Sequence, residues 1–87
     1  VRKAWVQERQ LVRTTGQGTR NWTEGEIQEL LNRGRVEGYH GHHINSVNAH
    51  PHLAGDPNNI SFVTPDEHFE LHNFNWQNAT SGPMHAR

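Results

Sequence analysis

The sequence lacks cysteine altogether, and it has no apolar run approaching the ~20 residues that a membrane-spanning helix requires. A disulfide and a cysteine-containing zinc finger are therefore both excluded. No signal-peptide pattern is visible at the amino terminus. The chain begins with Val1 rather than methionine, so we expect it to be a fragment or a domain of a longer protein.

Apolar side chains are also scarce, at 31% of the 87 residues, which allows one small domain with a thin core. Domains of this size often need a cross-link in addition to their core. Because disulfides are excluded, a bound metal ion is the physically motivated candidate for stabilising the fold.

Basic side chains are missing from most of the second half of the chain. Apart from Arg87, every lysine and arginine lies between Arg2 and Arg35, whereas all eight histidines lie at or after His40. This segregation is typical of a charged platform joined to a reaction centre, and equally of two solvated faces without a partner.

The local signals predict two helices in the basic half. Residues 2–12 are compatible with a helix in which Trp5 and Leu11 contact the core, and residues 14–20, with two glycines, favour a flexible connection. A second helix is marked by the capping box of Thr23 and Glu26. Its remaining signals are a contact of Trp22 with Ile27, a buried stripe of Ile27, Leu30 and Leu31, and a stop at Gly34.

A hairpin is predicted next. Residues 36–47 favour a strand that ends near Ser46, residues 50–58 a loop, and residues 60–63 a short return strand. The tail after residue 74 shows little periodicity, and Trp76 is expected to dock it onto the body. The predicted order is helix, helix, strand, strand, helix.

The last helix, expected over residues 65–74 and capped by Thr64, carries two histidines. His68 and His72 are four residues apart, so both imidazoles lie on one face and can bind one ion. A zincin-type protease site is excluded, because its base directly follows the first ligand, whereas Glu70 is rotated about 200° from His68.

His42 and His43 form an adjacent pair upstream. Neighbours in a regular strand point to opposite faces, but Gly41 allows an irregular backbone that could turn both toward one site. The alternative is that one ring packs inward and the other is simply exposed. Taken with His68 and His72, the pair favours one shared metal ion.

The remaining polar candidates carry weaker signals. Asn59 is ordinarily a turn former, although its amide could also bridge the hairpin loop and hold His43 in place. His40 lies two residues before His42 on the same strand face, where it could orient a ligand or contact substrate. No role is assigned to His50, His52 or His85.

Together these residues resemble a known family. Residues 38–82 are similar to the HNH/endonuclease VII superfamily, particularly the bacterial polymorphic-toxin nucleases with a Gly-His-His signature. The segment Gly41-His42-His43-Ile44-Asn45 matches that signature, and Asn59 and His68 match the rest of the HNH motif. His72 resembles the additional ligand of the three-histidine sites of DNase colicins, and residues 22–38 resemble the preceding helix of Rhs-associated toxin tips.

The resemblance implies an α+β fold, in which one or two helices precede a small ββα-metal (His-Me finger) core. One domain would span residues 1–87, with a helical, basic lead-in over 1–37 and the core over 38–82. One divalent ion (Mg²⁺, Zn²⁺, Mn²⁺ or Ni²⁺) would be bound by His42, His68 and His72. His43 would be the general base and Asn59 would position it.

The implied function is a metal-dependent, non-specific endonuclease acting on DNA. It would form the toxic tip of a larger secreted or Rhs-type bacterial carrier, be delivered by a secretion system into the target-cell cytoplasm, and be matched by an immunity protein. RNA as the substrate, a metal-stapled non-catalytic binding module, and a metal-free adaptor are the alternatives.

The charge distribution departs from this family. Its nucleases are often basic, whereas this chain has no lysine or arginine from Val36 through Ala86. We therefore expect Arg33 and Arg35, with His40, to supply the substrate contacts near the reaction centre. The alternatives are that the amino-terminal arginines or another part of the parent chain supply these contacts, and that Arg33 and Arg35 are solvated charges at a helix end.

Overall fold

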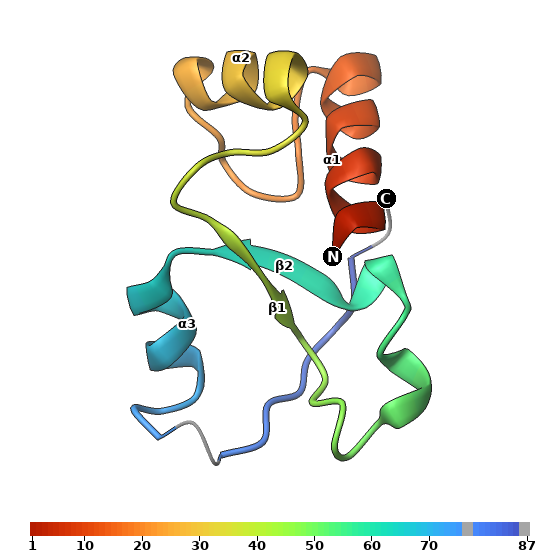
Figure 1. The fold of residues 1–87 in the computed structure, drawn as a ribbon, viewed down its shortest axis with the longest axis vertical. Coiled ribbons are helices and arrows are strands. Elements are labelled where there is room, and N and C mark those ends of the chain that lie inside the picture. The colour runs from red at the N-terminus through yellow and green to blue at the C-terminus, as the bar shows by residue number, and fades with distance from the viewer. Residues whose placement is uncertain (76–77, 86–87) are drawn as a thin grey trace.

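The computed structural model describes residues 1–75 and 78–85, and within them it has an α+β architecture (Figure 1). The helices are α1 (Arg2–Thr15), α2 (Glu24–Arg33) and α3 (Pro65–Leu71), and the strands are β1 (His40–His43) and β2 (Ile60–Val63). The predicted fold class and element order are confirmed. The predicted docking of Trp76 lies outside the described residues.

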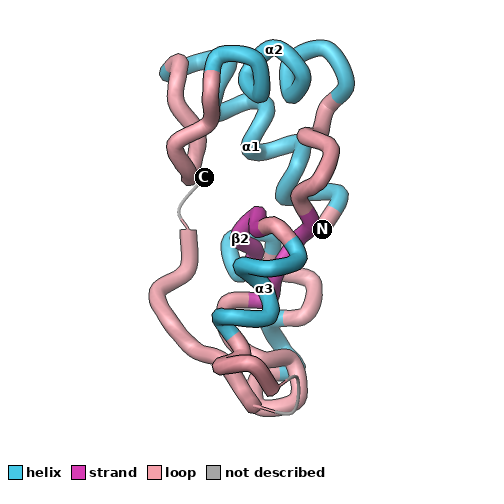
Figure 2. Tube along the Cα trace, turned by 90° about the vertical axis from the view of Figure 1, so that its left-hand side faces the viewer, coloured by secondary structure: helices cyan, strands magenta, loops and turns pink. Residues whose placement is uncertain are grey.

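The hairpin occupies the middle of the molecule. Helices α1 and α2 lie at one end and α3 lies toward the other (Figures 1 and 2). The loop between the strands contains two short 3₁₀ turns, Pro51–Leu53 and Pro57–Asn59. No helix in the described part of the chain is long and apolar enough to cross a bilayer.

Helix α2 forms where the sequence predicts it because both of its ends carry specific signals. The Thr23 hydroxyl accepts a hydrogen bond from the Glu26 backbone N–H at 3.2 Å, and the Glu26 carboxylate accepts one from the Thr23 N–H at 2.9 Å. Gly34 ends the helix with a φ of 81°, and its N–H donates to the Leu30 carbonyl at 2.8 Å. The same reciprocal box opens α3, between Thr64 and Glu67.

Two elements differ in length from the prediction. Helix α1 runs three residues further, to the left-handed cap at Gly16, and Leu11 is only half-buried on it. Strand β1 has four residues rather than the twelve of 36–47. Gly38, with a φ of 86°, turns the chain just before the strand. After His43 the regular pairing ends, because the Ile44 N–H donates to the carbonyl of Asn59, which belongs to a 3₁₀ turn and not to β2.

One hydrophobic core joins the two halves of the chain. Trp5 stacks on Phe62, with ring centroids 3.7 Å apart, so α1 packs directly against β2. The buried core residues come from both helices, the hairpin and the segment that joins them: Ala4, Val12, Trp22, Leu30, Val36, Ile60 and Phe62. The basic lead-in is therefore part of the surface against which the hairpin folds.

The connection between α1 and α2 is held in place rather than flexible as predicted. Glu8 is fully buried, and its carboxylate accepts hydrogen bonds from the Thr19 N–H at 2.6 Å, the Thr19 hydroxyl at 2.8 Å and the Trp22 indole at 2.9 Å. Gly18 passes so close to Glu8 and Trp22 that a side chain there would overlap both. The hydrogen bonds of the buried Glu8 carboxylate thus hold this connection in one conformation, although its two glycines favour flexibility.

Arg20 extends from this connection to α3. Its guanidinium donates to the Phe62 carbonyl at 2.8 Å and to the Glu67 carboxylate at 3.0 Å, and it lies 4.5 Å from the centroid of the Tyr39 ring. The hydrogen bond from Arg20, followed by the backbone hydrogen bond from Thr64, lowers the pKa of Glu67 to about 2. Arg20 therefore ties the start of α3 to the helical half.

We expect Glu67→Gln to lower the melting temperature near neutral pH by about 2–4 °C, from the loss of ~0.5 kcal/mol in a partly exposed ion pair. Gln preserves the capping geometry, so the change isolates the charge. A depressed carboxyl pKa stabilises the fold above its ordinary value of 4.5, and this contribution disappears as the pH falls toward 2. The difference between variant and wild type should shrink over that range in thermal melts. Glu70→Gln on the same helix is the matched control, and a difference that stays constant down to pH 3 would contradict the assignment.

Candidate metal centre and active site

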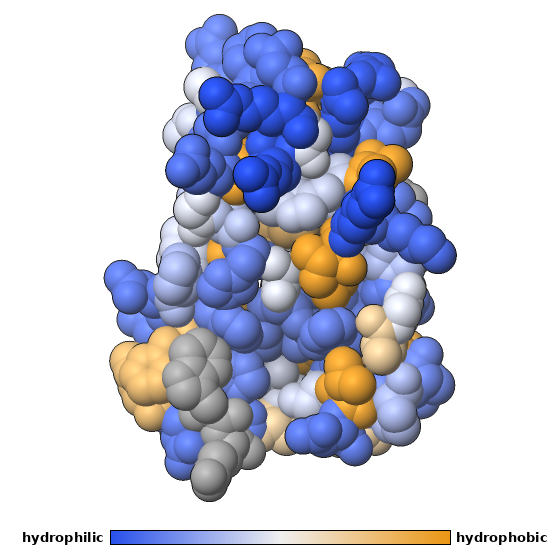
Figure 3. All heavy atoms as spheres, viewed as in Figure 1, coloured by the Kyte–Doolittle hydropathy of each residue, from blue (hydrophilic) through white to orange (hydrophobic). Residues whose placement is uncertain are grey.

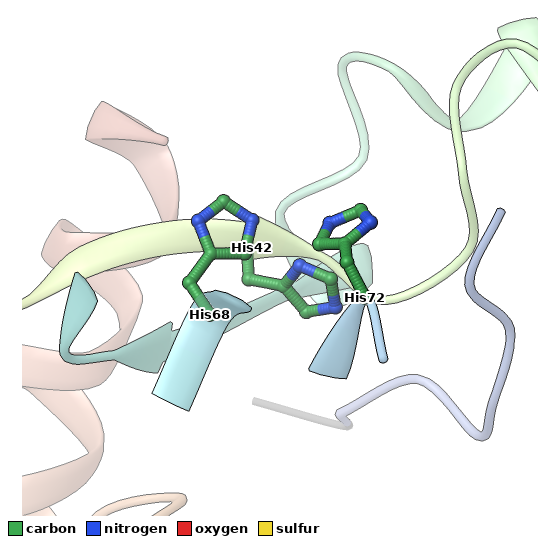
Figure 4. Close-up of side chains that lie close together, drawn as sticks. All are labelled: His42, His68 and His72. Carbon is green, nitrogen blue, oxygen red and sulfur yellow. The ribbon is translucent and has the colours of Figure 1, made fainter. Parts of the chain in front are cut away.

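Three histidines from two elements converge at one place (Figure 4). His42 comes from β1, and His68 and His72 come from α3 and its C-cap. Each can offer one ring nitrogen such that the three atoms lie within 4.8 Å of one another. The ring centroids are 4.9 to 5.4 Å apart. Ring nitrogens this close can share a single ion, and imidazole is the commonest protein metal ligand.

The hairpin register and the short link to α3 create this convergence. His42 pairs with Ser61, and β2 enters α3 through Thr64 alone, so α3 must fold back beside the hairpin. His42 is consequently buried, with only 5% of its surface exposed. The two α3 histidines are half-buried and lie toward it.

His72 lies at the end of α3 rather than inside it, because the helix stops at Leu71 instead of reaching residue 74. Asn73 and Phe74 have φ values of 52° and 58°, and a right-handed helix cannot continue through a left-handed backbone. The His72 N–H still donates to the His68 carbonyl at 3.3 Å. The two rings therefore keep the one-turn spacing that the sequence predicts.

A hydrogen bond determines which of the two ring nitrogens of His72 carries the proton. Its Nδ1 lies 2.9 Å from the carbonyl oxygen of Asn78, which can only accept, so Nδ1 carries the proton. The lone pair is then on Nε2, the atom that can bind an ion. The Asn78 side-chain amide in turn donates to the His72 carbonyl at 3.0 Å, so the same residue holds both the ring and the backbone.

Burial favours the uncharged form of His42 and His68. Desolvation, reinforced by the neighbouring histidines, lowers the pKa of His42 to about 4. Desolvation, with His40 and His72 as further causes, also lowers the pKa of His68. A metal ion binds the neutral imidazole, so it meets little competition from protons at these positions near pH 7. The donor set fits a divalent transition ion.

His43 opens onto the same site. A pocket of about 510 Å³ is lined by His42, His43, His68 and His72 together with residues 46–49 and 78–80. His42 and His43 can both line this pocket because His43 is the last residue of β1. Side chains alternate between the two faces only within a regular strand. His43 Nε2 lies 3.3 Å from the Ala54 carbonyl, so it donates there and the lone pair is on Nδ1.

Asn59 holds the backbone that follows His43 and not its ring. It is fully buried, and its side-chain oxygen accepts from the Asn45 N–H at 2.9 Å, while its amide donates to the Asn45 carbonyl at 3.0 Å. Its own carbonyl accepts from the Ile44 N–H at 2.8 Å. Asn59 therefore bridges the two sides of the hairpin loop immediately beyond His43.

Residues 78–80, at the start of the carboxy-terminal segment 78–85, line one side of the pocket, a role that the sequence did not predict. Ser46 and Thr80 exchange backbone and hydroxyl hydrogen bonds, and the Thr80 hydroxyl donates to the His43 carbonyl at 3.3 Å. The Asn45 amide donates to the Gly82 carbonyl at 3.0 Å.

Of the other predicted site residues, His40 lies beside the histidine cluster, whereas Arg33 and Arg35 lie at the other end of the molecule. His40 contacts His68, with His40 Nε2 2.7 Å from His68 Nδ1. Arg33 and Arg35 are exposed, and α2, which ends at Arg33, lies at the hydrophilic end of the molecule away from α3 (Figures 1 and 3). No lysine, arginine, aspartate or glutamate lines the pocket in the described part of the chain.

The sequence matches a family model described as "GHH signature containing HNH/Endo VII superfamily nuclease toxin" over residues 1–64. This is well over half of the chain. The chain belongs to this family. The match to these nuclease toxins includes His42, His43 and Asn59 but ends before His68 and His72. His68 and His72 are therefore assigned to the cluster from their positions in this structure.

The chain is also similar to animal teneurins. It is 46% identical to mouse (Mus musculus) teneurin-4 over 67 residues and 46% identical to mouse teneurin-3 over 65 residues. It is 45% identical to teneurin-m of Drosophila melanogaster over 62 residues. These matches cover 77%, 75% and 71% of this chain, which spans about 2% of the length of each teneurin. They give no support to the expected bacterial Rhs-type parent.

We expect Zn²⁺ to raise the melting temperature of the wild-type chain by roughly 10 °C or more at a hundredfold excess over its Kd, because binding then stabilises the fold by about 2.7 kcal/mol. His72→Ala should lose most of this shift, since only two of the three donors are left. His52→Ala, which removes an exposed imidazole outside the pocket, is the control. Identical melts with chelator and with Zn²⁺ would exclude the centre.

Proposed function

We propose that this chain is a metal-dependent endonuclease that hydrolyses DNA phosphodiester bonds without sequence specificity. The observation that carries the proposal is that three convergent histidines and a fourth one with a free ring nitrogen lie in one open pocket. Membership of a nuclease family supports it. Three protein ligands leave a coordination position for substrate or water, whereas a closed structural site uses four.

The chemistry divides between the ion and the protein. A divalent ion held by His42, His68 and His72 would polarise the phosphate and stabilise charge on the leaving 3′ oxygen. His43 Nδ1 takes a proton from water, whose oxygen attacks phosphorus in line as the bond to the 3′ oxygen breaks; that oxygen gains a proton from solvent. The contact of His43 Nε2 with the Ala54 carbonyl holds the ring in the tautomer that this step requires.

The pocket can attract phosphate without lysine or arginine. Three neutral imidazoles leave the full positive charge of a divalent ion uncompensated, and no carboxylate lines the described pocket to reduce it. Helix α3, the helix that contributes to the pocket, does not resemble a base-reading helix, because it has only seven residues and its histidine lies in the pocket. Recognition would then be directed to the backbone, which carries no sequence information.

The choice of DNA over RNA is the finer part of the proposal, and one experiment tests it together with the metal. Supercoiled plasmid and total RNA are each incubated with the chain, in the presence of chelator or of Mg²⁺, Zn²⁺, Mn²⁺ or Ni²⁺. Nicking of plasmid that chelator abolishes is the expected result. Degradation of RNA alone would make RNA the substrate, and no cleavage of either with any ion would exclude the nuclease.

We also propose that the domain is the toxic tip of a larger bacterial carrier, delivered by a secretion system into a target cell and neutralised by an immunity protein. The description of the family as nuclease toxins supports this context, whereas the similarity to animal teneurins favours a different parent. Production of the chain inside a bacterial host should arrest growth, and His43→Ala should not. Normal growth with active enzyme in the cytoplasm would remove the toxin assignment.

A second candidate function is a metal-stapled, non-catalytic binding module. The observation that favours it is the similarity to teneurins, none of whose names indicates a nuclease. The two functions share the three ligands and differ at His43, which a purely structural ion does not need. Metal binding without plasmid or RNA cleavage would select the binding module.

We expect His43→Ala to fold and to bind metal like the wild type, but to cleave plasmid ~10²–10⁴-fold more slowly, the usual cost of losing a general base. His43 is assigned to proton transfer and not to the ion, so calorimetric Zn²⁺ binding should be unchanged. The same change at His52 serves as the control. Plasmid nicking by His43→Ala at the wild-type rate would overturn the role of His43.

The combined variant Arg33→Ala, Arg35→Ala should bind a non-cleavable duplex less tightly and with a shallower dependence on salt. Binding to phosphate releases counterions, so removing a basic side chain that binds phosphate reduces the slope of log K against log salt. The metal content of the variant should not change. Because α2 lies away from α3, an unchanged affinity and slope would show that both side chains are solvated charges at a helix end.

A further inference from the structure

His40 is neither a proposed ligand nor the proposed base, yet it contacts the proposed ligand His68 directly. Its Nε2 lies 2.7 Å from Nδ1 of His68, and the two ring centroids are 4.6 Å apart. His40 opens β1, and the two-residue period of a strand places it on the same face as His42. The two strand histidines therefore flank His68.

The contact with His40 is made by Nδ1 of His68, which leaves Nε2 of His68 to bind an ion. Figure 4 shows one nitrogen of the His68 ring directed toward His72 and the other directed away. A proton between His40 and His68 allows two arrangements. If His68 Nδ1 donates to His40 Nε2, the His68 lone pair is on Nε2 and can bind the ion. If His40 donates instead, His68 Nε2 carries a proton and cannot bind.

The neighbouring ligand shows what such a contact achieves. His72 Nδ1 is held by the Asn78 carbonyl, which can only accept, so the lone pair of His72 stays on Nε2. His40 offers His68 an acceptor in the corresponding position, on a ring that the strand holds in place. Without that acceptor, a neutral histidine in water prefers to keep its proton on Nε2, and His68 would have to adopt the less favoured tautomer on binding.

We propose that His40 is a positioning residue, which accepts the Nδ1 proton of His68 and thereby orients the His68 ring to present Nε2 to the metal ion. This inference rests on the proposed metal centre. The sequence left two roles open for His40, orienting a ligand and contacting substrate, and the contact of its Nε2 with His68 Nδ1 favours the first. Contacts of this kind typically change metal affinity by ~10–100-fold.

Calorimetric titration of the intact chain with Zn²⁺ tests the proposal. We expect His40→Ala to bind Zn²⁺ ~10–100-fold more weakly than the wild type. His40→Gln should recover most of the affinity, because the glutamine side-chain oxygen can occupy the place of Nε2 and accept the same proton. His52→Ala is the matched control and should bind like the wild type. Wild-type affinity in a folded His40→Ala chain would overturn the proposal, and so would equal weakening in the Ala and Gln variants.

Nitrogen-15 NMR of the histidine rings tests the same assignment without metal. Wild-type His68 should carry its proton on Nδ1, and His40→Ala should shift it toward Nε2, a change that a purely structural role would not produce. A metal-free wild type with the proton on Nε2 would refute the inference even if Zn²⁺ binds. If the wild type binds Zn²⁺ but cleaves neither plasmid nor RNA, the proposed nuclease function fails and these measurements still decide the role of His40. If the wild type binds no divalent ion, the metal centre and this role of His40 both fail.

Discussion

The register of one short hairpin is the constraint on which the histidine centre depends. His42 pairs with Ser61, and a single residue, Thr64, then leads β2 into α3. This places His68 and His72 beside His42, whereas a slip of one residue would turn His42 to the opposite face of the sheet. With four residues in each strand, the hairpin alone is too short to hold that register.

Contacts with other parts of the chain stabilise the register that the two short strands cannot hold by themselves. Trp5 stacks on Phe62 from one side, and Arg20 joins the β2 backbone to the capping box of α3. On the other side, Asn59 and Asn45 close the loop and connect it to the carboxy-terminal segment. The pocket is thus assembled from three parts of the chain, and His68 and His72 each have a ring nitrogen in contact with a neighbouring residue.

The electrostatics of the pocket follow from its composition. No lysine, arginine or carboxylate lines the described pocket, and the pKa values of His42 and His68 are lowered, so a bound ion would be its dominant charge. The basic residues are gathered on the helical half, which contributes to the core. Under the proposed nuclease function, phosphate would be bound mainly through the ion, because no basic side chain lines the described pocket.

Local signals in the sequence determined the capped starts of α2 and α3, the return strand and the one-turn spacing of His68 and His72, because these depend on residues within a few positions of one another. Tertiary structure decided the rest. The length of β1 depends on where β2 begins, and the connection after α1 is held by Glu8. The contact of His40 with His68 joins residues 28 positions apart, and that of Asn45 with Gly82 joins residues 37 positions apart. Such pairs share no periodicity, so only the folded chain brings them together.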